Sequence, residues 1–110
     1  MADQIEVQIP RPVTLKEGSQ FTATAYFRTR STSAASTPTT VKYRLDCLTT
    51  GVELADWTTA TAASSVNIAI TGPHNAIQND GNDEEVKQLT IMADEGLNNQ
   101  VRQAVRWRVE

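Results

Sequence analysis

Residues 41–59, VKYRLDCLTTGVELADWTT, decide the fold of this chain. Their first half, residues 41–47, alternates strictly between apolar or aromatic side chains and charged ones. Because successive side chains of a strand point to opposite faces of a sheet, this alternation predicts a strand with one buried and one solvated face. A turn at residues 49–51 and a second short run, residues 52–54, lead to Trp57. We therefore predict a core strand, a tight return and a large aromatic side chain that closes over the core.

Similar alternation along the rest of the chain predicts further strands, separated by small polar connectors such as residues 30–40 and 58–65. Apolar residues do not repeat convincingly at helical spacing in this sequence. Val86 is out of phase with Leu89, which indicates a β-bulge near residues 87–88. The further predicted strands are residues 5–9, 21–28, 66–70, 86–93 and 101–109. With the opening stretch they make about seven strands, at the spacing typical of an all-β sandwich of antiparallel strands.

The length and composition indicate one folded domain. The chain has 110 residues, of which 39% are hydrophobic and 21% charged, and this balance suits a single core and argues against disorder. We expect residues 1–110 to form one β-sandwich domain, in which residues 1–12 could form an extended N-terminal arm. The single cysteine, Cys47, lies in the buried phase of its strand, where we expect it to act as a small hydrophobe.

The charge balance and the start of the chain bear on partners and location. The net charge of −3 argues against nucleic acid or an acidic membrane as the partner. The first residues are polar, no apolar segment typical of a signal peptide follows, and no stretch is long and apolar enough to span a membrane. We therefore expect synthesis in a cytoplasm and no membrane attachment.

Few residues offer catalytic or metal-binding chemistry. The only histidine, His74, follows Gly72 and Pro73 in a loop, and no serine or cysteine lies in a nucleophile motif. Residues 79–85, NDGNDEE, resemble an oxygen-rich cation loop but lack the EF-hand order, and Asn, Asp and Gly are also the ordinary turn formers. For residues 79–85 we favour a solvated turn and leave cation binding open. For the chain as a whole we expect no enzyme activity, no cofactor, no metal site and no small-molecule ligand.

Exposed basic residues form the candidate interface. If the predicted strands 21–28, 41–47 and 101–109 share a sheet, its outer face is basic, and Tyr26 is the one aromatic residue of these strands that alternates outward. Such a face could bind nucleic acid, contact a protein or protect the sheet from aggregation. We favour protein contact, because arginine is enriched in protein interfaces and stacking aromatics are few here. The candidate interface residues are Arg102, Arg106, Arg108, Arg44 and Tyr26.

The two tryptophans, Trp57 and Trp107, are the largest side chains available for burial. The second predicted strand carries small residues, Ala23 and Ala25, on its inner face, and these leave room for a large partner from the opposite sheet. We expect both tryptophans to fill the core. Either could instead anchor an interface, where tryptophan is also favoured.

Several runs of this chain are similar to those of small bacteriophage and prophage structural proteins. The matching runs are VKYRLD, TGVELADWT, VNIAI, NDEEVKQLTIMAD and a terminal WRV, and the resemblance covers residues 13–109. Proteins of that group have an immunoglobulin-like or fibronectin type III-like sandwich. The resemblance therefore implies such a fold and a virion role, as a capsid decoration, head-to-tail or tail component, and it supplies no catalytic residues.

We expect a non-enzymatic structural component of a bacteriophage particle that acts by protein–protein contact. Its partners are expected to be other virion proteins, with the chain present in multiple symmetric copies. Its location would be the virion, after synthesis in the cytoplasm of the bacterial host. The alternative is a carbohydrate- or receptor-binding module, because the loops of sandwiches can carry such sites. An enzyme ranks third, since the sequence offers no convincing acid–base pair.

Overall fold

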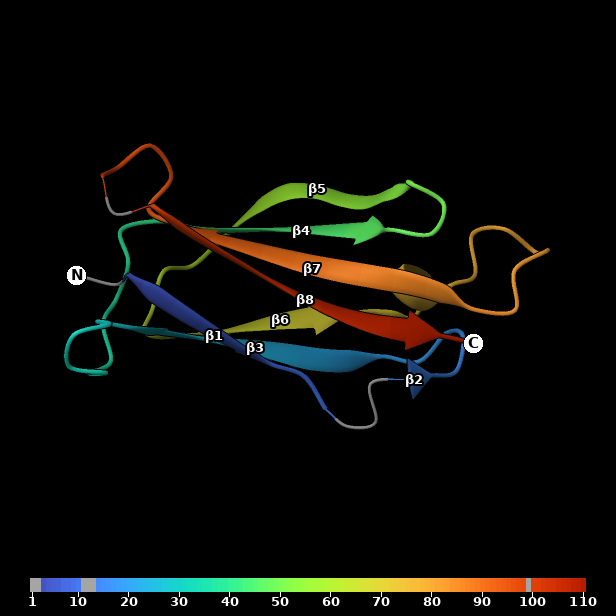
Figure 1. Cartoon of the computed structure of the whole chain (residues 1–110), viewed down its shortest axis with the longest axis horizontal. Coiled ribbons are helices and arrows are strands. Elements are labelled where there is room, and N and C mark those ends of the chain that lie inside the picture. Colours follow the sequence, from blue (N-terminus) through green and yellow to red (C-terminus); the bar gives the residue numbers. More distant parts are fainter. Residues whose placement is uncertain (1–2, 11–13, 99) are drawn as a thin grey trace.

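The computed structural model describes residues 3–10, 14–98 and 100–110, and its strands form two sheets that enclose a common core (Figure 1). The three-stranded sheet has the order β1–β3–β6, and the five-stranded sheet has the order β2–β8–β7–β4–β5. The strands are β1 (Gln4–Gln8), β2 (Thr14–Leu15), β3 (Phe21–Arg28), β4 (Val41–Cys47), β5 (Glu53–Ala60), β6 (Ser65–Ile70), β7 (Glu85–Ala93) and β8 (Val101–Val109), and a 3₁₀ turn, η1 (Gly72–Asn75), follows β6. The predicted all-β class is confirmed, and the two sheets are compatible with a β-sandwich.

The residues that alternate inward along the strands form the core. Inward-facing residues of both sheets form one cluster, and Phe27 of β3, Leu45 of β4 and Ile91 of β7 are fully buried in it. Removing this apolar surface from water is the main favourable term in folding, at about 25 cal/mol per Å². The polar partners of the same strands face outward, where β-branched and charged side chains suit a solvated sheet.

Trp107 of β8 fills the core, as predicted. It is 2% exposed, and its ring meets the ring of Phe21 edge-on, with centroids 5.1 Å apart and planes at 88°. This T-shaped geometry is favoured by the ring quadrupoles. Ala23, two residues further along β3, is fully buried, which agrees with the expectation that small residues there accommodate a large partner. The indole N–H donates to Asn75 Oδ1 at 2.7 Å, so the polar edge of the ring is satisfied.

The structure has more strands than the seven predicted. The additional strand is β2, whose two residues, Thr14 and Leu15, pair in parallel with the end of β8. The sequence pattern of residues 13–15 suggested a continuation of the first strand after the prolines, but Thr14 and Leu15 pair with β8 in the other sheet. In addition, β5 continues to Ala60, so residues 58–60, predicted as part of a connector, belong to the sheet.

The predicted bulge near residues 87–88 is wrong. β7 pairs with both β4 and β8 without a register shift. Val86 is out of phase because Glu85 and Lys87, a carboxylate and an ammonium group, occupy the inward positions and are fully buried. The irregular pairing lies instead between β4 and β5, with register shifts on both sides of Leu45.

The predicted sharing of one sheet by residues 21–28, 41–47 and 101–109 is also wrong. β4 and β8 lie in the five-stranded sheet, whereas β3 is the central strand of the three-stranded sheet. Alternation within a strand tells which residues share a face, but it does not tell which sheet the strand joins. The outward residues of β3 therefore lie on the opposite side of the molecule from those of β4 and β8 (Figure 1).

The N-terminal strand is part of the three-stranded sheet. β1 pairs antiparallel with β3 along its whole length, from Gln4 opposite Arg28 to Gln8 opposite Thr24. Of the predicted N-terminal arm, residues 1–2 and 11–12 lie outside the described residues.

Candidate functional site

The outer face of the five-stranded sheet brings together four of the five predicted interface residues. Arg44 lies on β4, and Arg102, Arg106 and Arg108 lie on β8, with β7 between these two strands. All four occupy positions that alternate with inward-facing residues, so they share one face. The structure therefore brings these four arginines together on β4 and β8, without the predicted contribution of residues 21–28.

Tyr26, the fifth predicted residue, is not on this face. It belongs to β3 in the other sheet, where it pairs with Glu6 and Ser65. The guanidinium carbon of Arg28 lies 5.8 Å from the centroid of the Tyr26 ring, and Arg28 also forms a 3.7 Å ion pair with Glu6. These residues form a separate small cluster on the opposite side of the sandwich.

Trp57 lies on the outer face of the five-stranded sheet, and the prediction that it fills the core is wrong. Between the pairs Tyr43–Thr58 and Leu45–Ala55, β5 contains one residue more than β4. Such a bulge interrupts the alternation of side chains between the two faces, and bulges characteristically re-aim a side chain in this way. Trp57 is thereby placed outside the core cluster and is only partly buried.

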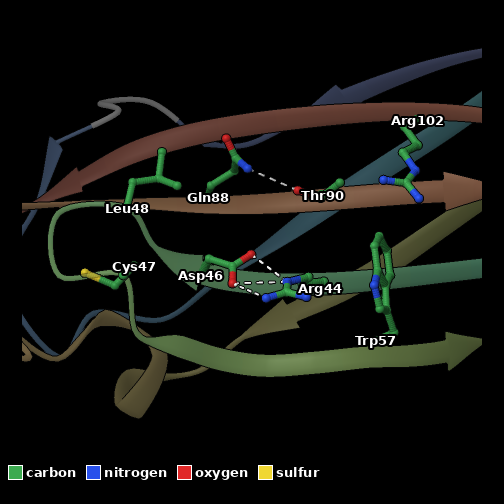
Figure 2. A pocket seen from close by; sticks show the side chains of 9 residues that line it. Arg44, Asp46, Cys47, Leu48, Trp57, Gln88, Thr90 and Arg102 are labelled. Atoms are coloured by element: carbon green, nitrogen blue, oxygen red, sulfur yellow. Dashed lines mark hydrogen bonds and ion pairs between the residues drawn. The ribbon is translucent and has the colours of Figure 1, made fainter.

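Trp57 crosses the sheet to meet the last strand. Figure 2 shows its ring rising from β5, beside Arg44, toward Arg102 of β8. The guanidinium carbon of Arg102 lies 5.6 Å from the ring centroid, within the range of a cation–π interaction. Met92 of β7 lies in register between Lys42 and Arg102 and is only 3% exposed, although it belongs to the outer face. This part of the face is therefore covered rather than open to solvent.

A shallow hollow of about 470 Å³ lies beside Trp57 (Figure 2). Its residues come from neighbouring strands of the five-stranded sheet and from the turn after β4. Polar and apolar groups both line it, with Leu48 as an exposed apolar residue at one end. The main lining residues are Arg44, Asp46, Leu48, Trp57, Gln88 and Arg102.

Arg44 is held in place by carboxylates of the same face. Its Nε donates to Asp46 at 3.0 Å, and its Nη2 forms a 3.1 Å pair with Glu53 of the edge strand β5. The hydrogen bond with Asp46, followed by the attraction of the Asp46 charge, raises the pKa of Arg44 above its ordinary value. The charge of Arg44 is therefore largely balanced within the sheet.

The three arginines of β8, Arg102, Arg106 and Arg108, differ from Arg44 in this respect, and we call them the arginine column. All three are exposed. Within the described residues, the ion pairs on this face involve Lys42 and Arg44, and no carboxylate pairs with the column. Arg106 donates from Nε to Gln88 Oε1 at 2.8 Å, and Arg102 stacks on Trp57, so two of its members are held by neutral partners.

The connection between η1 and β7 forms a second distinctive feature. Residues 78–84, which we call the tip loop, project beyond the sheets at one end of the molecule (Figure 1). The carboxylate of Glu85 fixes the base of this loop through three hydrogen bonds. It accepts the backbone N–H groups of Gln78 at 2.7 Å and Asn79 at 3.0 Å, and the side-chain N–H of Asn82 at 3.0 Å. The loop is thus a fixed turn, as expected for its Asn, Asp and Gly content.

Lys87 balances the buried charge of Glu85. Its ammonium group lies 2.9 Å from Glu85 Oε1 and 2.7 Å from the carbonyl oxygen of Ala76, and both charged side chains are fully buried. Burial by itself would raise the pKa of Glu85, but the hydrogen bonds from Gln78, Lys87, Asn82 and Asn79 outweigh it and lower that pKa to about 2. The described residues contain no group of three or more His, Cys, Asp or Glu side chains arranged to hold a metal ion.

His74 and Cys47 both make contacts with other residues of the fold. His74 Nδ1 accepts the backbone N–H of Thr71, the residue before η1, at 3.1 Å, and burial lowers the pKa of this histidine. Cys47 is buried as predicted, with its Sγ 3.5 Å from Glu85 Oε1.

Sequence reasoning missed two features, and the phase of the side chains in the sequence held a signal for each of them. Glu85 and Lys87 lie in phase with Leu89 and Ile91, so two opposite charges in the buried phase pointed to a buried pair. Trp57 is out of phase with Val52 and Leu54 of the same run, which pointed to an outward side chain, but the extra residue in the pairing of β5 with β4 could not be read from the sequence.

Comparisons of the chain with protein-family models, with curated proteins and with solved structures gave no match. No helix within the described part of the chain has the length and apolar character needed to cross a membrane.

Proposed function

We propose that this chain is a non-enzymatic structural component of a bacteriophage particle, a capsid decoration, head–tail or tail assembly module that acts by protein–protein contact. The observation that carries the proposal is the outer face of the five-stranded sheet. It combines Trp57 with exposed arginines, and Trp and Arg are the residues most enriched at the energetic centres of protein interfaces. The similarity of several sequence runs to phage structural proteins supports the choice of particle.

The strand order supports an immunoglobulin-like sandwich, which is the fold that this resemblance implies. Taken in chain order, β1, β3 and β6 correspond to strands A, B and E of such a domain, and β4, β5, β7 and β8 correspond to C, C′, F and G. The order β8–β7–β4–β5 then matches the G–F–C–C′ arrangement of the variable type. A small domain of this kind presents two outer faces and several sheet edges for contact with neighbours.

Purified particles test the proposed function. Particles from a phage-producing culture would be banded on a density gradient, and the chain would be quantified by mass spectrometry against the major capsid protein. We expect a constant ratio of chain to capsid protein across the particle band. An abundant cytosolic host protein is the control for contamination. If the chain follows that host protein and is lost from the band on repeated purification, the proposal is wrong.

A carbohydrate-binding role is the second candidate, and the hollow beside Trp57 favours it. An aromatic ring next to Arg44, Asp46 and Gln88 offers the mixture of apolar surface and polar groups that small-ligand sites use. The ring is already stacked on Arg102, and the hollow is shallow, so we rank this role below protein contact.

A glycan panel separates the two roles. A carbohydrate site would change the fluorescence of Trp57, and this response would be lost in Trp57→Phe, while buried Trp107 would remain as an internal reference. We expect no response from the parent protein across the panel. A saturable response that depends on Trp57 would favour carbohydrate binding instead.

A further inference from the structure

The arginine column and the tip loop carry opposite, unbalanced charges at different places on the same chain. The column presents three exposed guanidinium groups, and the tip loop presents three exposed carboxylates, those of Asp80, Asp83 and Glu84. Within the described residues, none of these six side chains takes part in an ion pair. By contrast, Lys42 and Arg44 on the same face are paired with carboxylates.

We propose that the arginine column docks the acidic tip loop of a second copy of this chain. The proposal rests on the proposed function and names the partner of the outer face. The charges are equal in number and opposite in sign, and charge complementarity of this kind sets register and speeds encounter between proteins. Since the loop and the column are different surfaces, the contact is heterologous, and repetition closes a ring or extends a filament.

The tip loop is held in one shape, and its three carboxylate residues are exposed. Glu85 and Lys87, both fully buried, fix the base of the loop, and Asn79 Oδ1 accepts the backbone N–H of Gly81 at 3.0 Å within it. A loop fixed in one shape loses little conformational freedom on binding. It projects at the end of the molecule (Figure 1), so it is available to another copy.

Two of the three arginines of the column are also ordered before binding. Arg102 is stacked on Trp57, and Arg106 is hydrogen-bonded to Gln88 (Figure 2 shows Trp57, Arg102 and Gln88). Arg106 and Arg108 occupy alternate positions of one strand, so their side chains leave the sheet in the same direction. These features keep the guanidinium groups on the outer face without cancelling their charge.

The same observations disfavour nucleic acid as the occupant. The ring of Trp57 is covered on one side by Arg102, and Tyr26 lies on the other sheet, so the face lacks the free aromatic platforms on which bases stack. Asp46 and Glu53 lie beside Arg44 and would repel a phosphate backbone. The positive charge is therefore confined to β8, and a short acidic protein segment fits it better than a long polyanion.

A pair of charge-reversal variants tests the contact. Arg106→Glu/Arg108→Glu makes the column acidic, and Asp80→Lys/Asp83→Lys makes the loop basic. Sedimentation velocity over a concentration series at low ionic strength should show association of the parent chain and loss of association in each variant alone. Because each double substitution replaces attraction by repulsion, we expect an apparent dissociation constant weaker by roughly tenfold or more in each variant.

Mixing the two variants restores opposite charges at both contacts, so the mixture should associate again. The control is Arg28→Glu/Arg30→Glu, which changes the net charge by the same amount as the column variant but lies on and after β3 in the other sheet. This control should associate as the parent does. Near 1 M salt, where the Debye length is about 3 Å, association of the parent should disappear. Circular dichroism of every variant checks that the fold is kept.

A parent chain that stays monomeric across the series at low salt overturns the proposal, as does a column variant that associates as well as the parent. An oligonucleotide or an acidic protein that binds the column while the chain alone stays monomeric identifies a different occupant and also overturns it. The particle experiment tests the proposed function independently. If the chain is found in particles but is monomeric in solution, the proposed function stands and the proposed contact is wrong. If the chain associates in solution but is never found in particles, the contact stands and the proposed function is wrong.

Discussion

At the scale of single residues, the buried Glu85–Lys87 pair links the core to the tip loop. A buried ion pair is a weak source of stability, because desolvation of both charges offsets their attraction. Here the carboxylate also accepts hydrogen bonds from Gln78, Asn79 and Asn82, so it fixes the conformation of a loop that has few apolar contacts of its own. The pair therefore contributes mainly to the shape of the loop.

The pKa of Glu85 leads to a prediction about acid stability. It is lowered from 4.5 to about 2 in the folded chain, so ionised Glu85 favours folding above pH 4.5, and this contribution is lost as the pH falls toward 2. We expect the difference in unfolding free energy between the parent and Glu85→Gln to shrink by about 3 kcal/mol across that range. Urea unfolding at a series of pH values measures it.

The matched control for this prediction is Glu84→Gln, which changes the adjacent, exposed carboxylate. It should unfold with nearly the same free energy as the parent at pH 7, since exposed substitutions are usually within about 0.5 kcal/mol of neutral. If the difference between the parent and Glu85→Gln is constant from pH 7 to pH 2, the hydrogen bonds of this carboxylate do not stabilise its ionised form.

At the scale of elements, the bulge in β5 decides the roles of the two tryptophans. In a regular β4–β5 pairing the alternation would continue unbroken, but the extra residue between Ala55 and Thr58 places Trp57 on the outer face. Trp107 lies on β8, which pairs with β7 without a shift, and stays in the core. Two residues of one type thus have different energetic roles because of the pairing of their strands.

Substitution of the two tryptophans measures this difference. Trp107→Ala removes a fully packed ring and leaves Asn75 Oδ1 without its donor, so we expect a loss of about 3–5 kcal/mol of unfolding free energy. Trp57→Ala removes a cation–π contact on the outer face, and we expect a loss of about 1 kcal/mol. Thermal or urea unfolding of both variants checks the order, and equal losses would contradict it.

At the scale of the whole molecule, local pattern predicted the elements better than their arrangement. The period-2 alternation of residues 41–47 and 66–70 identified real strands and most of their buried residues, because burial on one face imposes that period. The assignment of β3 to the same sheet as β4 and β8 was wrong, since sheet membership depends on contacts between residues far apart in the sequence.

The candidate site was also predicted only in part, because local pattern shows which residues of one strand share a face but not how the strands are arranged. Arg102, Arg106 and Arg108 share a strand, so their common face followed from the sequence, and Arg44 joins them because β7 bridges β4 and β8. Tyr26 is absent from this face because β3 belongs to the other sheet, and Trp57 is present on it because of the bulge in β5. The local pattern of one sequence reveals neither the sheet assignment nor the bulge.

The short parallel pairing of β2 with β8 affects how the domain would bear mechanical force. Beyond the pairs at Thr14 and Leu15, the N–H of Glu110 donates to the Leu15 carbonyl at 2.8 Å and the N–H of Glu17 donates to the Glu110 carbonyl at 2.8 Å. Because the strands are parallel, tension that pulls β2 backward from its start and β8 forward from its end slides one strand along the other. Such shear loads these hydrogen bonds together instead of opening them one by one. A few residues can thus act as a clamp when the start of β2 and the end of β8 are pulled apart.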